Sequence, residues 1–258
     1  MIVFLTMLAM GMVIGFVGAG GAGVVIAVLT LIFEIPVHTA VGTSLAAMIF
    51  TTISGTFSHF REGNINFKVG LTVGAVGFVG AFIGSKIATN YLSGSNLRLC
   101  TASMLVASAV LVYSRLTWPD LPIFHPRGGG QTESNFSGPS FWILAVIGGL
   151  GNGLLSGTFG IGAAQFIQLT LLIFFGLPLF QSVGTTMLII LPMAVSGGLG
   201  YLLSGFLDIT LFIQVLLGLM IGAYTGAKFT RHAPRWLLKT AMVIMPGLAG
   251  VLLLVLKH

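Results

Sequence analysis

The chain carries the same sequence pattern twice. When it is aligned with itself at an offset of 142 residues, the segment 15–86 matches the segment 157–228 without a gap, and 18 of the 72 aligned pairs are identical. The identical positions are mainly glycine, proline and small residues, which set turns and close packing, whereas interchangeable apolar residues match by chance more often. The chain is therefore an internal duplication, and its two halves are expected to fold alike.

Composition places the chain in a membrane. Of its 258 residues 56% are hydrophobic and 6% are charged, whereas a soluble domain has about 25% charged residues. Apolar stretches close to the 20 or so residues that cross a bilayer recur, and they lack the two-residue alternation of a membrane barrel. They are Val37–Phe57, Phe67–Thr89, Leu97–Tyr113, Leu179–Leu203, Ile209–Phe229 and Trp236–Leu256. We predict an all-α polytopic protein of the cytoplasmic (inner) cell membrane.

Each half opens with an apolar segment that is too long for one span, Ile2–Phe33 in the first and Phe141–Phe175 in the second. A helix of about 32 residues would be about 48 Å long, whereas the hydrocarbon core is about 30 Å thick. Glycine-rich stretches interrupt both segments, at Gly18–Gly23 and Gly157–Gly162, and each glycine costs a helix about 1 kcal/mol relative to alanine. The helices are expected to break there, either as one bent crossing or as two half-helices that enter and return to the same side.

The positive charges separate these two arrangements. Re-entrant opening segments would make the halves inverted and would place eight Lys and Arg residues on one face against three on the other, whereas parallel halves would give six against five. The eight are Arg61, Lys68, Arg115, Arg127, Lys228, Arg231, Arg235 and Lys239, and the three are Lys86, Arg98 and Lys257. Because the positive-inside rule favours the uneven split, we predict two inverted repeats. Each would be a glycine-broken re-entrant helix pair followed by three full transmembrane helices, with both termini outside.

The two repeats are predicted to span residues 1–114 and 140–258, joined by a cytoplasmic loop at residues 115–139 that is rich in Pro, Gly and Ser. The net charge of +6 is explained by cytoplasmic loops, so no nucleic-acid partner is expected. The partner that composition requires is the lipid bilayer. The single Cys100 cannot form an intrachain disulfide.

The glycine breaks are the predicted substrate site. The half-helices Ala22–Phe33 and Ala163–Phe175 would begin at the breaks and point their amino-terminal ends at the centre of the protein. Such an end carries about half a positive charge and free N–H groups, and inverted-repeat transporters bind substrates at breaks of this kind. We predict that a small anion binds to Gly20, Gly21, Ala22, Gly162, Ala163 and Ala164. The alternative is that the glycines serve close helix packing.

Polar side chains near the breaks are predicted to supplement the backbone. The duplicated motif Val41-Gly42-Thr43-Ser44 and Val183-Gly184-Thr185-Thr186 supplies the hydroxyls of Thr43, Ser44, Thr185 and Thr186. These hydroxyls would donate to an anion or bond back to the preceding helical turn. Gln165 and Gln168 are polar within an apolar stretch, as is Asn152; they would either contact the substrate or link two helices.

The sequence offers little to other functional classes. It has no metal-binding cluster, Walker loop or nucleophile elbow, so we expect no cofactor, no bound metal and no enzyme activity. An anion channel is the alternative to a secondary transporter, but a channel needs a continuous polar path. An intramembrane enzyme ranks third, since no nucleophile and base are visible.

Both halves contain a glycine-rich break, a proline and a small-hydroxyl motif, and the first ends a span with Arg61-Glu62-Gly63-Asn64-Ile65. In these features the whole chain resembles the TauE/SafE family of sulfite exporters. In the second half Gly205-Phe206-Leu207 keeps only the glycine of that turn. The resemblance implies transport of a small sulfur-containing anion such as sulfite, an organosulfonate or thiosulfate, driven by a gradient of protons or sodium ions. A permease for a non-sulfur organic anion stays an alternative, and a homodimer is left open.

Overall fold

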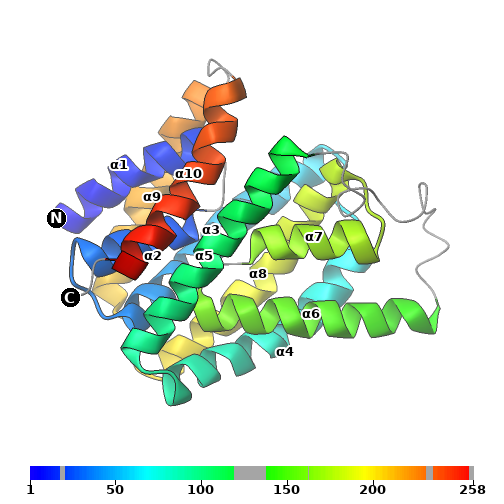
Figure 1. The fold of residues 1–258 in the computed structure, drawn as a ribbon, viewed down its shortest axis with the longest axis horizontal. Coiled ribbons are helices and arrows are strands. Elements are labelled where there is room, and N and C mark those ends of the chain that lie inside the picture. Colours follow the sequence, from blue (N-terminus) through cyan, green and yellow to red (C-terminus); the bar gives the residue numbers. More distant parts are fainter. Residues whose placement is uncertain (18–20, 119–137, 162, 231–234, 256–258) are drawn as a thin grey trace.

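A computed structural model describes the chain except for residues 18–20, 119–137, 162, 231–234 and 256–258. The regular structure of the described residues is entirely helical (Figure 1). The helices are α1 (Ile2–Val17), α2 (Ala22–Leu31), α3 (Val37–Arg61), α4 (Phe67–Tyr91), α5 (Gly94–Thr117), α6 (Pro139–Phe159), α7 (Ala164–Phe174), α8 (Leu179–Leu203), α9 (Ile209–Thr230) and α10 (Arg235–Val255). The predicted all-α membrane class is confirmed.

Five helices of the described part are long and apolar enough to cross a membrane, namely α3, α4, α5, α6 and residues Gln181–Leu203 of α8. Four of them coincide with predicted spans, and α9 and α10 lie where two more were predicted. The fifth, α6, has 21 residues, although the prediction made it one arm of a re-entrant pair. A re-entrant arm of this length would reach through most of the bilayer, because 21 residues extend about 31 Å.

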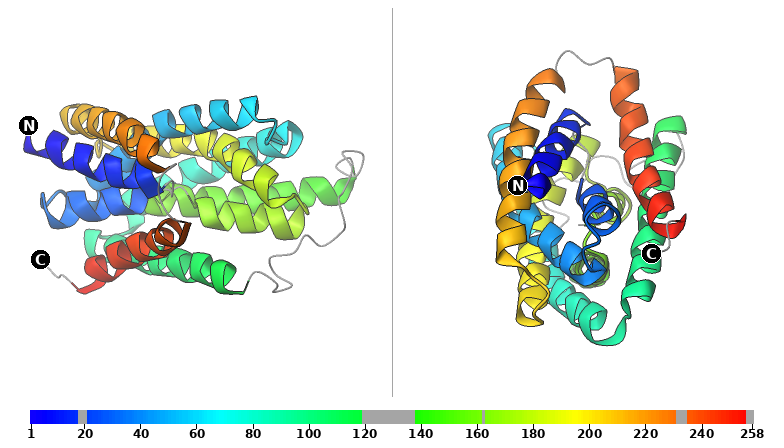
Figure 2. Two further views of the ribbon diagram at one scale, coloured as in Figure 1. Left: turned by 90° about the horizontal axis from the view of Figure 1, so that it is seen from above. Right: turned by 90° about the vertical axis from the view of Figure 1, so that its left-hand side faces the viewer.

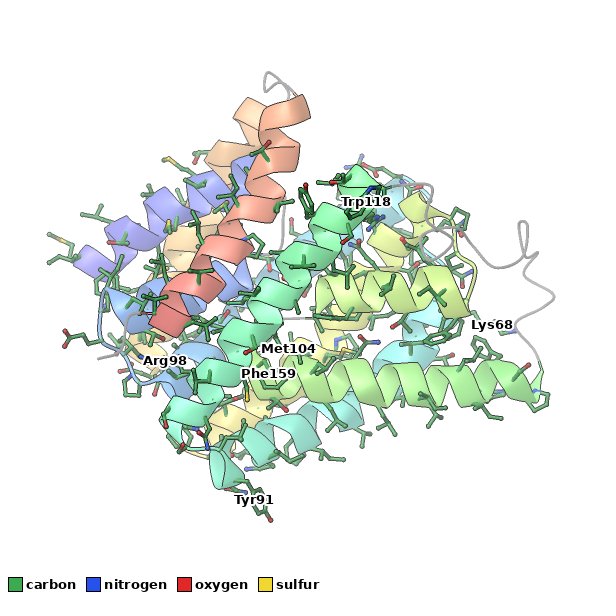
Figure 3. The ribbon with its side chains drawn as sticks, in the orientation of Figure 1. Lys68, Tyr91, Arg98, Met104, Trp118 and Phe159 are labelled. Atoms are coloured by element: carbon green, nitrogen blue, oxygen red, sulfur yellow. The ribbon has the colours of Figure 1, made fainter. Side chains whose placement is uncertain are left out.

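Polar and aromatic residues cluster at the ends of the spans. Lys68 lies in the first turn of α4 and Tyr91 ends it, while Trp118 follows α5 (Figure 3). Tyr91 is 81% exposed and Trp118 is 56% exposed. Aromatic rings with polar atoms are enriched at membrane interfaces, so these positions are consistent with helices α4 and α5 spanning from one interface to the other.

Both opening helices break where glycine predicted it. The first break separates α1 from α2, and the second separates α6 from α7. At the second break Gly160 has a φ of +68°, and an added Cβ would lie 2.5 Å from Cγ1 of Val41. Both the left-handed backbone and the close approach exclude a side chain there. Glycine therefore ends α6 and also lets α3 pack against the break.

Helix α7 folds back along α6. The side-chain amide of Asn152 donates to Oγ1 of Thr170 at 2.9 Å, and a Cβ on Gly148 would lie 2.9 Å from Cγ2 of Thr170. A residue before the break thus meets one at a similar distance after it, which requires antiparallel helices. Figure 1 shows α6 and α7 as neighbouring helices joined at one end. Of the two arrangements that a glycine break allows, a bent crossing or a hairpin, the second half adopts the hairpin.

The two halves interlock through their first and fourth helices. Helix α6 packs along α4 of the other half, and α1 packs along α9. A Cβ on Gly80 would lie 2.7 Å from the carbonyl oxygen of Leu150, and a Cβ on Gly222 would lie 2.2 Å from that of Leu8. Since these two pairs are related by the 142-residue offset, the same contact is made twice. Each half completes the packing of the other.

The equivalent helices α3 and α8 pack antiparallel. Gly42, near the start of α3, faces the carbonyl oxygen of Phe206, beyond the end of α8. Gly184, near the start of α8, faces the carbonyl oxygen of Asn64, beyond the end of α3. These pairs again differ by 142 residues. The start of each of these helices therefore packs against the chain just beyond the end of the other.

The core lies where the breaks and the paired helices meet. One buried cluster joins Ile26 and Val41 of the first half to Ile161 of the second. A second cluster joins Ala22 of the first half to Ala164 and Ile190 of the second. Figure 2 shows α2 enclosed by the surrounding helices when the molecule is viewed from one end. The buried apolar surface therefore does not divide at the boundary between the repeats.

Candidate functional site

The two breaks approach one another in this core. Gly160 lies against Val41 and within 3.3 Å of Ile26 as measured from an added Cβ. Across the break of the first half, Ser44 donates its hydroxyl to the carbonyl of Ala22 at 3.1 Å. Ala22, Ala163 and Ala164 belong to the same buried cluster. Residues at the amino-terminal ends of α2 and α7 therefore belong to one buried cluster.

Neither of these helix ends is capped by a side chain. The N-cap residues are Gly21 and Ala163, which have no side-chain acceptor to offer. The first intrahelical bonds are made by Val25 to Gly21 and by Ile167 to Ala163. The N–H groups of the first turns precede these bonds and have no intrahelical acceptor. With the helix dipole they make each end a donor site for negative charge.

The backbone at Ala163 is unusual. Its φ is +48°, a left-handed conformation that residues other than glycine rarely adopt, and its side chain is completely buried. Such conformations cost about 1 to 3 kcal/mol and cluster at functional sites. Gly21 is partly exposed, and Ala22 and Ala164 are buried. Gly20 and Gly162, which were also predicted to bind the anion, lie outside the described residues.

The four predicted hydroxyls have different surroundings. Ser44 bonds the carbonyl of Ala22, as described, and Thr186 bonds back to the carbonyl of Ser182 at 2.7 Å. Oγ1 of Thr185 accepts the backbone N–H of Asn66 at 3.0 Å. Thr43 is completely buried, and its hydroxyl has no partner among the described residues. Back-bonding therefore describes Thr186, whereas Thr43 keeps an unused donor.

The predicted amides also differ. Asn152 forms a hydrogen bond between α6 and α7, so of its two predicted roles it has the one of linking two helices. Gln165 is partly buried in the first turn of α7. Oε1 of Gln168 accepts a hydrogen bond of 2.8 Å from Nη1 of Arg115. The prediction had assigned Arg115 to the loop after α5, but it lies in the last turn of that helix. The sequence signal was its position two residues beyond a predicted span.

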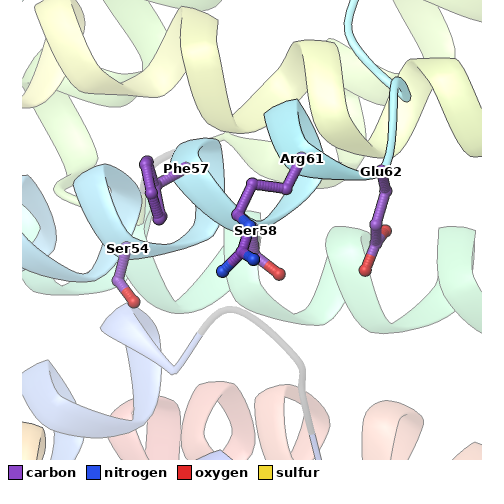
Figure 4. A pocket seen from close by; sticks show the side chains of 5 residues that line it. All are labelled: Ser54, Phe57, Ser58, Arg61 and Glu62. Carbon is purple, nitrogen blue, oxygen red and sulfur yellow. The ribbon is translucent and has the colours of Figure 1, made fainter.

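A surface pocket of about 340 Å³ lies along the second half of α3. Figure 4 shows Arg61 and Ser58 pointing into the same space, with Ser54 and Phe57 beside them and Glu62 at one end. The guanidinium of Arg61 is 5.9 Å from the ring centre of Phe57. Oε2 of Glu62 lies 3.4 Å from Nδ1 of His59 and accepts a hydrogen bond of 3.1 Å from the side-chain amide of Asn64. The sequence did not predict this pocket.

In the part of the chain that the structure describes, no group of three or more His, Cys, Asp and Glu residues is arranged to hold a metal ion. The donors at the breaks are instead backbone N–H groups, hydroxyls and amides. Free N–H groups at a helix start can donate to an anion.

Comparison with known proteins identifies the family. The family model described as "Sulfite exporter TauE/SafE" matches residues 3–253. The chain is 50% identical to the probable membrane transporter protein YdhB of Bacillus subtilis over 98% of this chain and 100% of that protein. It is 25% identical to the probable membrane transporter protein MJ0441 of Methanocaldococcus jannaschii over 97% of both chains. No solved structure matches the chain. With a family model that covers nearly its whole length and a half-identical relative named a transporter, the chain belongs to the TauE/SafE family of membrane transporters.

Proposed function

We propose that the protein is a secondary transporter that moves a small sulfur-containing anion, such as sulfite or an organosulfonate, across the cytoplasmic membrane. The anion is held between the amino-terminal ends of α2 and α7. The observation that carries this proposal is the pair of helix ends without side-chain caps, at Gly21 and Ala163, next to the buried residues Ala22 and Ala164. The description of the matching family supports sulfite or a related anion as the substrate.

A helix end can attract an anion within the membrane at a lower free-energy cost than a buried cationic side chain. A fixed positive side chain near the centre of a bilayer is costly, whereas a helix end provides positive potential with no ionised group to desolvate. The first-turn N–H groups of α2 and α7 need acceptors in any case, because the surrounding core is apolar. An anion between them satisfies both helices at once.

The transport mechanism proposed here is alternating access between inverted halves. Three observations support inversion: the antiparallel packing of α3 and α8, the hairpin of α6 and α7, and the eight-to-three distribution of Lys and Arg. The start of α1 and the end of α10 also lie at the same end of the molecule in Figure 1. In this orientation the connecting segment faces the cytoplasm. A gradient of protons or sodium ions drives the transport of the anion.

Substitution of Gln165 tests the site. Binding of sulfite, sulfoacetate and sulfate is titrated by calorimetry in detergent. Gln165→Leu is expected to weaken binding by about 1 to 3 kcal/mol, and the isosteric Gln165→Glu by more, since it places a negative charge at the end of α7. Gln181→Leu is the matched control, because Gln181 lies in the first turn of α8, beyond the far end of α7. Equal affinities in all four proteins would move the site elsewhere.

Flux measurements test the class. In proteoliposomes a transporter gives saturable uptake and counterflow of labelled sulfite against an unlabelled gradient. Flux that rises without saturation and shows no counterflow would assign the protein to the anion channels. Saturable uptake of a carboxylate in preference to sulfite would support the runner-up, a permease for a non-sulfur organic anion.

A further inference from the structure

Arg115 is a partly buried cation without an acidic partner among the described residues. It lies in the last turn of α5, and its side chain reaches α7, where it bonds Gln168. No carboxylate that the structure describes forms an ion pair with it. Asp120 and Glu133 of the connecting segment lie outside the described residues, so the experiment below includes one of them.

A partly buried guanidinium with no carboxylate partner among the described residues would be stabilised by a bound anion. Removing a charged group from water is costly unless an opposite charge replaces the solvent. The amide of Gln168 supplies one neutral acceptor, which satisfies a single N–H of the five that the guanidinium carries. The other four donors and the positive charge have no protein partner among the described residues.

The hydrogen bond between Arg115 and Gln168 also determines which hydrogen-bonding groups these two side chains can offer to a ligand. Because Oε1 of Gln168 accepts from Arg115, the amide N–H₂ of the same side chain is left as a donor. Arginine has no acceptor of its own. The two side chains together therefore offer mainly donors, with one lone pair of Oε1 as the remaining acceptor. The planar guanidinium suits an anion with at least two oxygen atoms, to which it can bond in a bidentate manner.

The pair lies close to the uncapped end of α7. Gln168 follows Ala164, the first residue of α7, by four residues, which is about 6 Å along the helix. The donors of the Arg115 and Gln168 side chains therefore lie about one helical turn beyond the free N–H groups of the first turn of this 11-residue helix. A two-oxygen anion at that end comes within reach of the long arginine side chain.

We propose that Arg115 is a ligand of the transported oxyanion and that Gln168 orients its guanidinium. This inference rests on the proposed function and adds a charged side chain to a site otherwise built of backbone and neutral groups. It favours substrates with two or more equivalent oxygens, such as sulfite, sulfonates and carboxylates, over halide ions. The contact also couples α5 to the re-entrant pair, so that binding of an anion ties the end of α5 to α7.

Arg61 provides a matched control. It lies in the last turn of α3, as Arg115 lies in the last turn of α5. Arg61 is exposed and lies over the ring of Phe57, whereas Arg115 is partly buried against α7. Both substitutions remove one positive charge from a corresponding helix end, so a general loss of surface charge affects them equally.

The experiment is a titration of sulfite and of chloride into detergent-purified wild type, Arg115→Gln, Arg115→Lys, Gln168→Leu and Arg61→Gln. Arg115→Gln is expected to weaken sulfite binding at least tenfold, Arg115→Lys less than Arg115→Gln, and Gln168→Leu to an intermediate degree. Arg61→Gln should stay within twofold of wild type. Melting curves identify variants that fail to fold, and Arg115→Lys then retains the test because it keeps the charge and the packing of the stem.

Three outcomes would overturn the proposal. If Arg115→Gln binds sulfite like wild type while Gln165→Glu does not, the anion site stands and Arg115 is not part of it. If Asp120→Asn and Arg115→Gln lower the melting temperature equally and leave sulfite affinity intact, Arg115 is the partner of Asp120. If Arg115→Gln loses only the binding of phosphatidylglycerol added to the detergent, the bound oxyanion is a lipid phosphate. Absence of sulfite binding in the wild type itself would instead remove the proposed function.

Discussion

The hydroxyl of Tyr201 in α8 donates a hydrogen bond of 3.0 Å to the backbone carbonyl of Thr158, in the last turn of α6. Tyr201 is completely buried. The hydroxyl of Thr158 in turn donates to the carbonyl of Gly84 in α4 at 3.2 Å. The end of α6 is therefore fixed from two sides immediately before Gly160, where the helix breaks. A helix end that leaves carbonyls unpaired in an apolar core requires partners of this kind.

Tyr201→Phe should lower stability. The substitution removes the hydroxyl and leaves the carbonyl of Thr158 without this partner in the core, at an expected cost of about 1 to 3 kcal/mol. Thermal unfolding in detergent measures the effect. Tyr91→Phe is the control, because Tyr91 is 81% exposed. Equal melting temperatures for Tyr201→Phe and wild type would mean that the hydrogen bond does not stabilise the break.

Gly184→Ala should disrupt the pairing of α3 with α8. A Cβ at position 184 would lie 2.2 Å from the carbonyl oxygen of Asn64, and backbone atoms cannot rotate away as a side chain can. The expected cost is about 1 to 3 kcal/mol or more, seen as a lower yield of monodisperse protein and a lower melting temperature. Gly94→Ala is the matched change, because a Cβ there meets nothing within 4 Å. Tolerance of both substitutions would contradict the close contact.

Thr43→Val and Thr185→Val should have opposite consequences for stability, although the two threonines are equivalent in the duplication. Thr43 has no hydrogen-bond partner among the described residues, so its replacement should leave stability unchanged or raise it. Thr185 accepts the N–H of Asn66, so its replacement should cost about 1 to 3 kcal/mol. If the hydroxyl of Thr43 serves the anion, Thr43→Val should weaken sulfite binding at unchanged melting temperature. Equal destabilisation by both changes would refute this difference.

Cysteine labelling tests the orientation of the halves. In a Cys100→Ser background, which removes the exposed native thiol, Glu62→Cys should react with an impermeant maleimide only from the cytoplasmic side. Ser95→Cys should react only from outside, because α4 separates the two positions. Each residue is exposed, so access is limited by the membrane alone. Labelling of Glu62→Cys from outside would reverse the orientation derived from the positive charges.

Much of the fold could be predicted from local properties of the sequence. Helix α8 runs over the residues predicted from its apolar length, and Pro36 and Pro178 directly precede α3 and α8. The helix breaks after Val17 and Phe159 also lie within the two glycine-rich stretches where they were predicted. These features are local because a bilayer selects spans by apolar length and because glycine weakens a helix wherever it occurs. The duplication then related the elements of one half to those of the other.

Which helices pack together was decided only by the tertiary structure. The sequence alone did not indicate that Gly80 faces Leu150 or that Gly184 faces Asn64. A glycine indicates that another segment can pack closely against it, but it does not indicate which segment does so. It placed Arg115 in a loop, since the partner that draws this side chain inward, Gln168, is 53 residues away. In the same way, equivalent threonines at 43 and 185 acquired different surroundings from helices that are distant in the sequence. Local chemistry determined the helices and their breaks, whereas contacts between distant segments decided which donors were left for a ligand.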